Sequence, residues 1–171
     1  MSGLSLTTLA NLAEIIGAGS IITGLVFGWY QIRQYRILQR DAIAMNLAQT
    51  FYSNDLAQAI SLVQTLPDGI SLEKMRERGP EYSQAAITIT TSFETMGFLV
   101  FKRIASLELV VDLAGGIVTT MTRKLGRWLE DLRVEQEQPS WGEWFEWLGR
   151  QAAKIQSVTE PAHIKYRNWK P

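Results

Sequence analysis

Apolar residues are distributed unevenly along the chain, and one long apolar run stands near its N-terminus. Between Leu4 and Tyr30 the only charged residue is Glu14. A helix over Leu9–Tyr30 rises about 33 Å, which is enough for a hydrocarbon layer of about 30 Å. Trp29 and Tyr30 close the run, and aromatic side chains gather at membrane interfaces. The pattern predicts a transmembrane helix over these residues; the alternative is the buried core helix of a soluble protein.

The residues that flank this run predict its orientation. Arg33, Arg36 and Arg40 follow it, and no basic side chain precedes it. Because positive charge favours the cytoplasmic side, we expect the N-terminus outside and the rest of the chain in the cytoplasm. The run lacks the basic start and small-residue cleavage site of a signal peptide. The sequence therefore predicts an uncleaved single-pass anchor in the plasma (inner) membrane.

Small residues recur along one face of the predicted span. Steps of three and four residues keep them on one stripe of a helix. Such stripes let membrane helices approach closely, so we expect self-association into a homo-oligomer through this face. The residues of this small-residue stripe are Ala13, Gly17, Ser20, Gly24 and Gly28.

After the span, helical periodicity and helix-breaking residues predict an all-α fold. The span continues as helix through residues 31–52, and Ser53 caps the next helix. Further helices are expected over 55–66, 72–78, 80–104, 107–113 and 117–136, with Gly115-Gly116 bending or breaking the chain. A capping box at Ser140–Glu143 opens a last helix to residue 157. One predicted buried stripe consists of Ala86, Ile89, Phe93, Met96, Gly97, Val100 and Ile104.

These elements predict three parts: an anchor over residues 1–30, a cytoplasmic helical bundle over 31–157 and an extended tail over 158–171. The tail interleaves basic and aromatic residues, a pattern that suits anionic lipid headgroups and single-stranded nucleic acid equally. The predicted membrane nearby favours headgroups. We therefore assign a membrane-surface role to the tail together with the arginines after the span. The tail residues concerned are Lys165, Arg167, Trp169 and Lys170.

The composition excludes several kinds of chemistry. Basic and acidic residues balance at 17 each, which argues against a nucleic-acid partner. The absence of Cys and the single His exclude thiolate and multi-histidine metal sites. His163 has no arginine at the spacing that helical ribonucleases require, and no nucleotide-binding or nucleophile motif is present. We expect no catalytic residues, metal or cofactor, and hence no enzyme.

Two carboxylates stand out as candidate polar sites. Glu14 lies within the apolar run, where an ionisable group is a functional candidate at a pore mouth; the alternative is a position at the outer interface. Glu94 lies beside the predicted buried stripe, where a carboxylate needs a partner. Arg123 and Arg127 on the following long helix are the expected partners.

Three segments carry a resemblance to a known family. The segment Asn11–Arg33, with its AEIIGA and GLVFGWYQIRQ pattern, resembles the start of a widespread uncharacterised bacterial family, and Ser92–Leu99 and Leu109–Gly116 resemble later parts of it. The resemblance implies one N-terminal membrane helix and a small helical cytoplasmic domain, without an established activity. In architecture alone, the chain also resembles the membrane-anchored accessory proteins of Cas13-type CRISPR systems, a likeness that implies pore formation.

These observations lead to one functional hypothesis with one alternative. The hypothesis is a membrane-anchored, self-associating module without catalytic activity, whose partners are the bilayer, a second copy and another protein at the bundle. The alternative is an oligomeric pore that acts as a defence or stress effector.

The predicted anchor has a direct experimental consequence. The protein should sediment with membranes and resist carbonate extraction, since the apolar run stays in the bilayer. Deletion of residues 1–30 should release the remainder into the soluble fraction. An intact chain recovered as a freely soluble species would contradict the placement.

Overall fold

The computed structural model describes the backbone of residues 6–51 and 53–170; within the first helix it describes the side chains of residues 11, 14–35, 42 and 49. These residues form helices joined by turns, with no strand among them, which confirms the all-α fold class. Contacts divide the chain into two units, residues 1–42 and residues 43–171.

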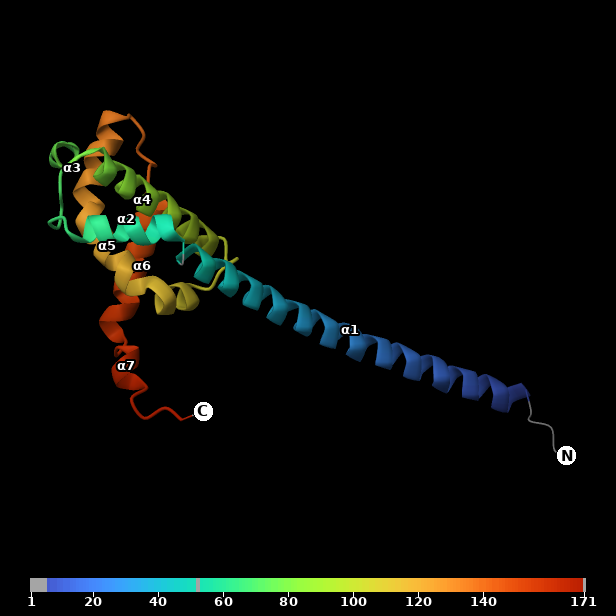
Figure 1. The fold of residues 1–171 in the computed structure, drawn as a ribbon. Coiled ribbons are helices and arrows are strands. Elements are labelled where there is room, and N and C mark those ends of the chain that lie inside the picture. Colours follow the sequence, from blue (N-terminus) through green and yellow to red (C-terminus); the bar gives the residue numbers. More distant parts are fainter. Residues whose placement is uncertain (1–5, 52, 171) are drawn as a thin grey trace. The chain divides into compact units, whose positions relative to one another are not determined.

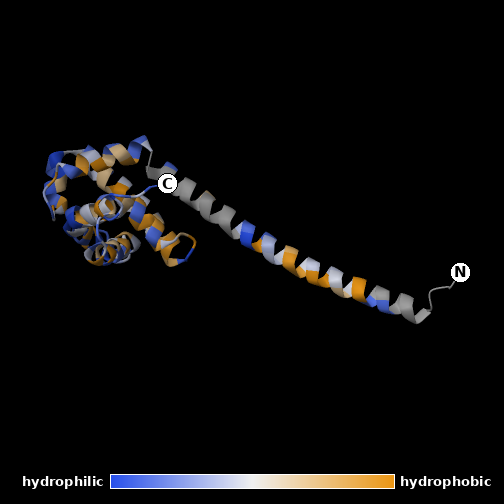
Figure 2. Cartoon of the chain, turned by 90° about the horizontal axis from the view of Figure 1, so that it is seen from below, coloured by the Kyte–Doolittle hydropathy of each residue, from blue (hydrophilic) through white to orange (hydrophobic). Residues whose placement is uncertain are grey.

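The N-terminal unit lies within one long helix, α1 (Leu6–Phe51), of 46 residues (Figure 1). As predicted, the helix continues without a break past Tyr30. Between Ile15 and Phe27 seven exposed large apolar side chains cover about two thirds of the helix circumference, and the small-residue stripe covers the rest. Most of this stretch is coloured as apolar in Figure 2. Such a helix requires an apolar environment around its whole circumference.

The second unit contains shorter helices whose starts follow from local capping. The Ser53, Ser71 and Ser106 side chains accept hydrogen bonds from backbone N–H groups in the first turns of the helices that follow them. Pro80 opens α4 at a position where no N–H is needed. The helices are α2 (Asn54–Gln64), α3 (Leu72–Arg78), α4 (Pro80–Phe101), α5 (Leu107–Glu135), α6 (Glu143–Val158) and α7 (Ala162–Lys165).

The core of this unit is built around α4, which packs against both α2 and α6, while α6 also packs against α5. Phe93 of α4 and Phe145 of α6 stack in its centre with ring centroids 5.8 Å apart, and both are 0% exposed. The predicted α4 stripe is buried with one exception. Ile104 is 52% exposed, because α4 ends at Phe101 and Ile104 lies in the turn that follows.

The predicted break at Gly115-Gly116 is wrong. Helix α5 runs through both glycines, and the Thr119 Oγ1 donates to the Gly115 carbonyl oxygen over 2.9 Å. A Cβ added to Gly115 would lie 3.0 Å from the Gln156 Nε2 of α6. Each glycine costs a helix about 1 kcal/mol, and packing along the rest of α5 outweighs that cost. The tail also differs from expectation, since α7 forms one helical turn within it.

Two other glycines permit the close packing of α6. A Cβ on Gly97 of α4 would collide with the backbone carbonyl of Trp144 at the start of α6. A Cβ on Gly149 of α6 would collide with the Thr122 side chain of α5. Helix α6 can therefore pack this closely against α4 and α5 only because glycine, which has no side chain, occupies positions 97 and 149.

The close packing of α6 on α4 predicts that alanine at Gly97 lowers stability, whereas alanine at Gly116, where no such contact exists, does not. Gly97→Ala should lower the free energy of unfolding by about 1–3 kcal/mol, because the collision is with backbone that cannot rotate away. Gly116→Ala, where nothing lies within 4 Å, is the matched control. It should raise stability by up to about 1 kcal/mol through helix propensity. Urea unfolding followed by circular dichroism measures both, and a neutral Gly97→Ala would contradict the described packing.

Candidate functional site

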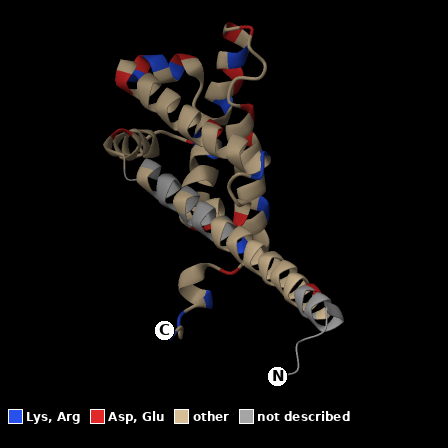
Figure 3. Cartoon of the chain, turned by 90° about the vertical axis from the view of Figure 1, so that its right-hand side faces the viewer, with Lys and Arg blue, Asp and Glu red and all other residues tan. Residues whose placement is uncertain are grey.

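The structure contains one helix, among the described residues, that is long and apolar enough to cross a membrane. The qualifying segment is Glu14–Tyr35, 22 residues long, and none of its most apolar stretch is buried by the rest of the chain. Ile15 and Leu25 are each 69% exposed, and Trp29 is 66% exposed. Between Glu14 and Arg33 this segment carries no charge (Figure 3). The side chains of residues 9, 10, 12 and 13, at the start of the predicted span, lie outside the described residues.

The small-residue stripe lies on this helix, and the chain itself leaves it uncovered. Around Gly17, Gly24 and Gly28 no atom lies within 4 Å of an added Cβ. The Ser20 hydroxyl donates to the Ile16 carbonyl oxygen over 2.9 Å, so it needs no partner in an apolar medium. The Ala13 side chain lies outside the described residues.

Aromatic and polar side chains meet at the C-terminal end of the apolar segment. The Arg33 guanidinium lies 6.0 Å from the centre of the Trp29 ring. The Gln34 Nε2 donates to the Tyr30 hydroxyl over 2.8 Å. This arrangement resembles the interfacial belts of membrane helices. The side chains of Arg36 and Arg40, assigned to the membrane surface, lie outside the described residues.

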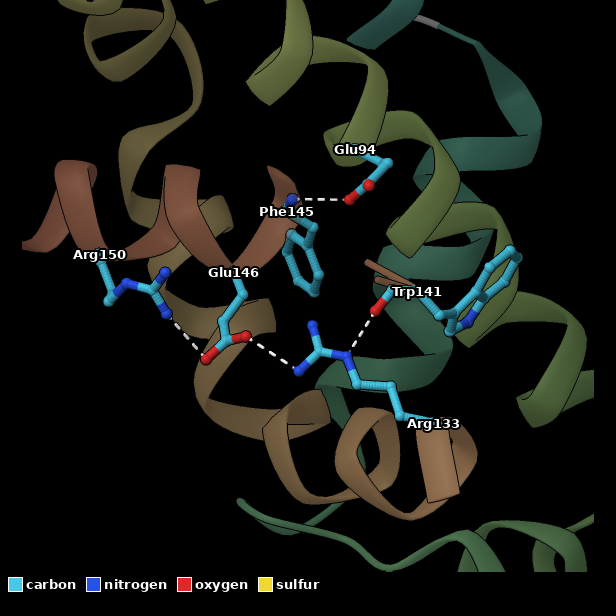
Figure 4. Close-up of polar contacts among 6 residues, drawn as sticks. All are labelled: Glu94, Arg133, Trp141, Phe145, Glu146 and Arg150. Carbon is cyan, nitrogen blue, oxygen red and sulfur yellow. Dashed lines mark hydrogen bonds and ion pairs between the residues drawn. The ribbon is translucent and has the colours of Figure 1, made fainter. Parts of the chain in front are cut away.

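The two candidate carboxylates occupy different environments. Glu14 is exposed on α1 at the start of the apolar segment. Glu94 is partly buried, and its Oε2 accepts a hydrogen bond of 2.8 Å from the backbone N–H of Phe145 (Figure 4). The sequence predicts that Glu94 pairs with Arg123 or Arg127. The Glu94 carboxylate binds the Phe145 N–H instead, and Arg123 pairs with Asp68 over 2.8 Å.

Glu94 instead caps helix α6 from a neighbouring helix. The N-cap residue of α6, Gly142, has a left-handed φ of 67° and offers no side chain, so the predicted capping box at Ser140 is also wrong. Phe145 is the third residue of α6, a position whose N–H has no partner within the helix. The carboxylate supplies that acceptor and places a negative charge at the positive end of the helix dipole.

The Arg133 side chain binds the loop that leads into α6, and no sequence motif predicts this role. Its Nε donates to the Trp141 carbonyl oxygen over 2.7 Å, and its Nη1 lies 3.0 Å from the Glu146 carboxylate. Glu146 also pairs with Arg150 over 2.8 Å (Figure 4). The Arg133 side chain is only 17% exposed. No short-range pattern reveals these contacts, because they join α5 to a loop and to another helix.

The basic and aromatic tail residues are exposed, as a surface role requires. Trp169 is 70% exposed, and Lys165, Arg167 and Lys170 are exposed as well. The Lys165 ammonium lies 5.0 Å from the centre of the Tyr166 ring. A hydrogen bond with Tyr166 raises the pKa of Lys165, so this lysine stays charged at neutral pH.

The helical unit contains a groove and a smaller pocket. A groove of about 760 Å³ runs between α3 and α5, where the Arg76 guanidinium forms two hydrogen bonds of 2.6 and 2.8 Å with Glu135. These hydrogen bonds lower the pKa of Glu135. A pocket of about 150 Å³ lies beside Glu94 and Trp141. Among the described residues no three His, Asp or Glu side chains gather where they could hold a metal ion.

The sequence also matches a known family model. The model is described as a domain of unknown function, DUF4760, and the match covers residues 18–151. The chain belongs to the DUF4760 family. The matched region includes most of the apolar segment of α1 and continues into α6, so the DUF4760 domain spans both units. No curated protein and no solved structure matches the chain.

The cap provided by Glu94 can be tested by substitution. Glu94→Ala should lower the free energy of unfolding by about 1–2 kcal/mol, since the Phe145 N–H loses its acceptor. Glu94→Gln keeps an acceptor oxygen and should cost less. Glu130→Ala, an exposed carboxylate on α5, should change stability by less than about 0.5 kcal/mol. Equal unfolding midpoints for Glu94→Ala and Glu130→Ala in urea would refute the capping role.

Proposed function

We propose that this DUF4760 protein is a membrane-anchored helical module that self-associates through α1 and presents its helical unit as a binding platform. The observation that carries the proposal is the uncovered apolar segment of α1. The proposed location is the plasma (inner) membrane, with the N-terminus outside and the helical unit in the cytoplasm. The further proposed partner is another protein bound at the helical unit.

Free energies support burial of α1 in lipid. Seven large apolar side chains between Ile15 and Phe27 are at least 60% exposed. At about 1.5–3 kcal/mol for each side chain, their removal from water is favourable by on the order of 10–20 kcal/mol. Glu14 lies at the end of the segment, where a charged side chain opposes insertion less than at the helix centre, for which insertion scales give roughly 3 kcal/mol. Burial therefore outweighs the charge, and the arginines that follow support the proposed orientation.

The open surface of the small-residue stripe supports self-association. Because no atom of the same chain fills the space beside Gly17, Gly24 and Gly28, the backbone there is free to contact a second helix. Dispersion forces drive such contacts in lipid, and they weaken steeply as the helix backbones move apart.

Two observations support binding rather than catalysis. The Glu94 and Arg133 side chains bind backbone groups at the start of α6 and in the loop before it, and thereby hold α6 in place. The groove between α3 and α5 is occupied by an ion pair, Arg76 with Glu135, without a nucleophile or a histidine beside it.

The alternative is an oligomeric pore, and the position of Glu14 favours it. Glu14 lies three residues before Gly17, about 60° from it around the helix. In a ring of subunits packed through the stripe, the Glu14 carboxylates would converge near one mouth and attract cations. Cation flux into liposomes that Glu14→Gln reduces would favour this alternative over the platform.

The proposed association face predicts which substitutions disrupt assembly. Gly24→Leu combined with Gly28→Leu should lower the crosslinking yield in membranes, because leucine forces the packed backbones apart. Neither substitution creates a collision within the chain, so the folded unit should be unaffected.

Gly19→Leu is the matched control for this experiment. Gly19 also has open space beside it, and it lies about 140° from Gly24 around the helix. Its crosslinking yield should equal that of the unaltered chain. An undiminished yield in the double variant would exclude the stripe and move the assembly surface to another part of the chain.

A further inference from the structure

Four aromatic rings gather at the surface where the end of α4 meets the start of α6. Phe101 lies 4.4 Å from Trp144 and 6.0 Å from Trp147, measured between ring centroids. Phe98 lies 6.0 Å from Trp144 on the other side. The Lys102 ammonium stands 5.5 and 5.8 Å from the centres of the Phe98 and Phe101 rings. These four rings and Lys102 are called the aromatic cluster below.

Phe98 and Phe101 lie outside the hydrophobic core, while Trp144 and Trp147 are half-buried and Trp147 packs against the core. Phe98 is 41% exposed and Phe101 is 49% exposed, whereas Phe93 on the same helix is fully buried. The period of the helix explains this difference in exposure. Phe93, Met96 and Val100 lie on the face of α4 that packs into the core, and Phe98 and Phe101 lie on another face of the helix. Ile104, three residues after Phe101, is 52% exposed and adds a further apolar side chain to this end of α4.

The size of the cluster is too small for a stable contact with a second copy. A large aromatic side chain can bury about 150–250 Å², and the four rings are already partly covered by one another. The cluster therefore offers on the order of 300 Å², against about 800 Å² for each partner in a stable dimer. A surface of this area can form only a weak contact, which becomes significant when the molecule is already anchored beside its partner.

The chemistry of the cluster matches the headgroup region of a bilayer. Tryptophan and phenylalanine combine apolar area with affinity for the interface, and tryptophan adds an indole N–H. Lys102 and Arg103 follow Phe101 directly and are exposed, so both can reach anionic phosphates. The acidic residue adjoining the rings in sequence is Glu143, while the nearby Glu146 is neutralised by Arg133 and Arg150.

The rest of the chain keeps this surface near a bilayer if α1 is inserted. At about 1.5 Å per residue, the part of α1 beyond Tyr35 is about 24 Å long. Contact of the cluster with the bilayer then takes place within an already anchored molecule, so it requires less intrinsic affinity than the binding of a free protein.

We propose that the aromatic cluster docks the helical unit onto the bilayer, with its rings at headgroup level and Lys102 and Arg103 against lipid phosphates. This inference rests on the proposed membrane anchoring by α1. It assigns a membrane contact to the C-terminal end of α4 and the N-terminal end of α6, in addition to the contact proposed for the basic tail.

The natural absence of cysteine makes the full chain suitable for spin labelling. Phe101→Cys and Ile104→Cys each place a nitroxide at the cluster, and the second lies outside the helix, so it keeps the test independent of the fold of α4. Gln84→Cys, exposed on the first half of α4, is the water-facing control. Val26→Cys reports insertion of α1. The protein is reconstituted in phosphatidylcholine vesicles with and without phosphatidylglycerol.

Collision of each nitroxide with oxygen and with a water-soluble nickel chelate distinguishes the outcomes. In anionic vesicles the cluster labels should show a several-fold higher ratio of oxygen to nickel collisions than the Gln84 label. Lys102→Gln should lower the equilibrium constant for docking onto anionic vesicles roughly five-fold at low salt. Lys74→Gln on α3 should leave this constant unchanged.

Three other outcomes would overturn the docking proposal in different ways. A lipid-facing Val26 label with water-facing cluster labels would reject docking while leaving the anchor intact. A water-facing Val26 label would reject the anchor and docking together. Cluster labels shielded from both reagents would show that protein covers the surface instead of lipid.

Discussion

The constraint on which the whole account depends is a helix that its own chain does not cover. Large apolar side chains project from α1 between Ile15 and Phe27, and none of the most apolar stretch is buried. A soluble protein would bury such a helix in its core, as this chain does with Phe93 and Phe145. Since the hydrophobic effect scales with exposed apolar area, α1 needs either lipid or protein around its circumference. Every functional proposal made above follows from that requirement.

The second unit depends on a different interaction: residues of α4 contact the first turn of α6 and determine where that helix begins. Glu94 and Gly97 are three residues apart and lie on one face of α4. The first accepts the Phe145 N–H, and the second lets the Trp144 carbonyl approach closely. Together they replace the local capping that Gly142 cannot provide. The same junction brings Trp144 and Trp147 beside Phe98 and Phe101, so one helix contact both stabilises the unit and forms the aromatic cluster.

Much of the fold follows from short-range sequence signals, and the errors share one cause. Serine caps and Pro80 locate the starts of α2, α3, α4 and α5 because the relevant interactions span three or four residues. Contacts between distant helices decided the remaining features. Gly115 stays helical because α6 packs beside it, and the cap of α6 comes from Glu94, which lies 51 residues before Phe145. The roles of Glu94 and Arg133 and the clustering of four rings could be seen only after the helices were assembled.

Cysteine scanning through α1 tests the central claim most directly. Single cysteines at each position from Ile21 to Val26 sample all sides of the helix, since six successive residues cover more than one turn. In sealed vesicles, the account predicts that a membrane-impermeant maleimide leaves every one of these positions unlabelled until detergent is added. Rapid labelling on any side of the helix in intact vesicles would contradict it, because that side would then face water or an aqueous protein surface.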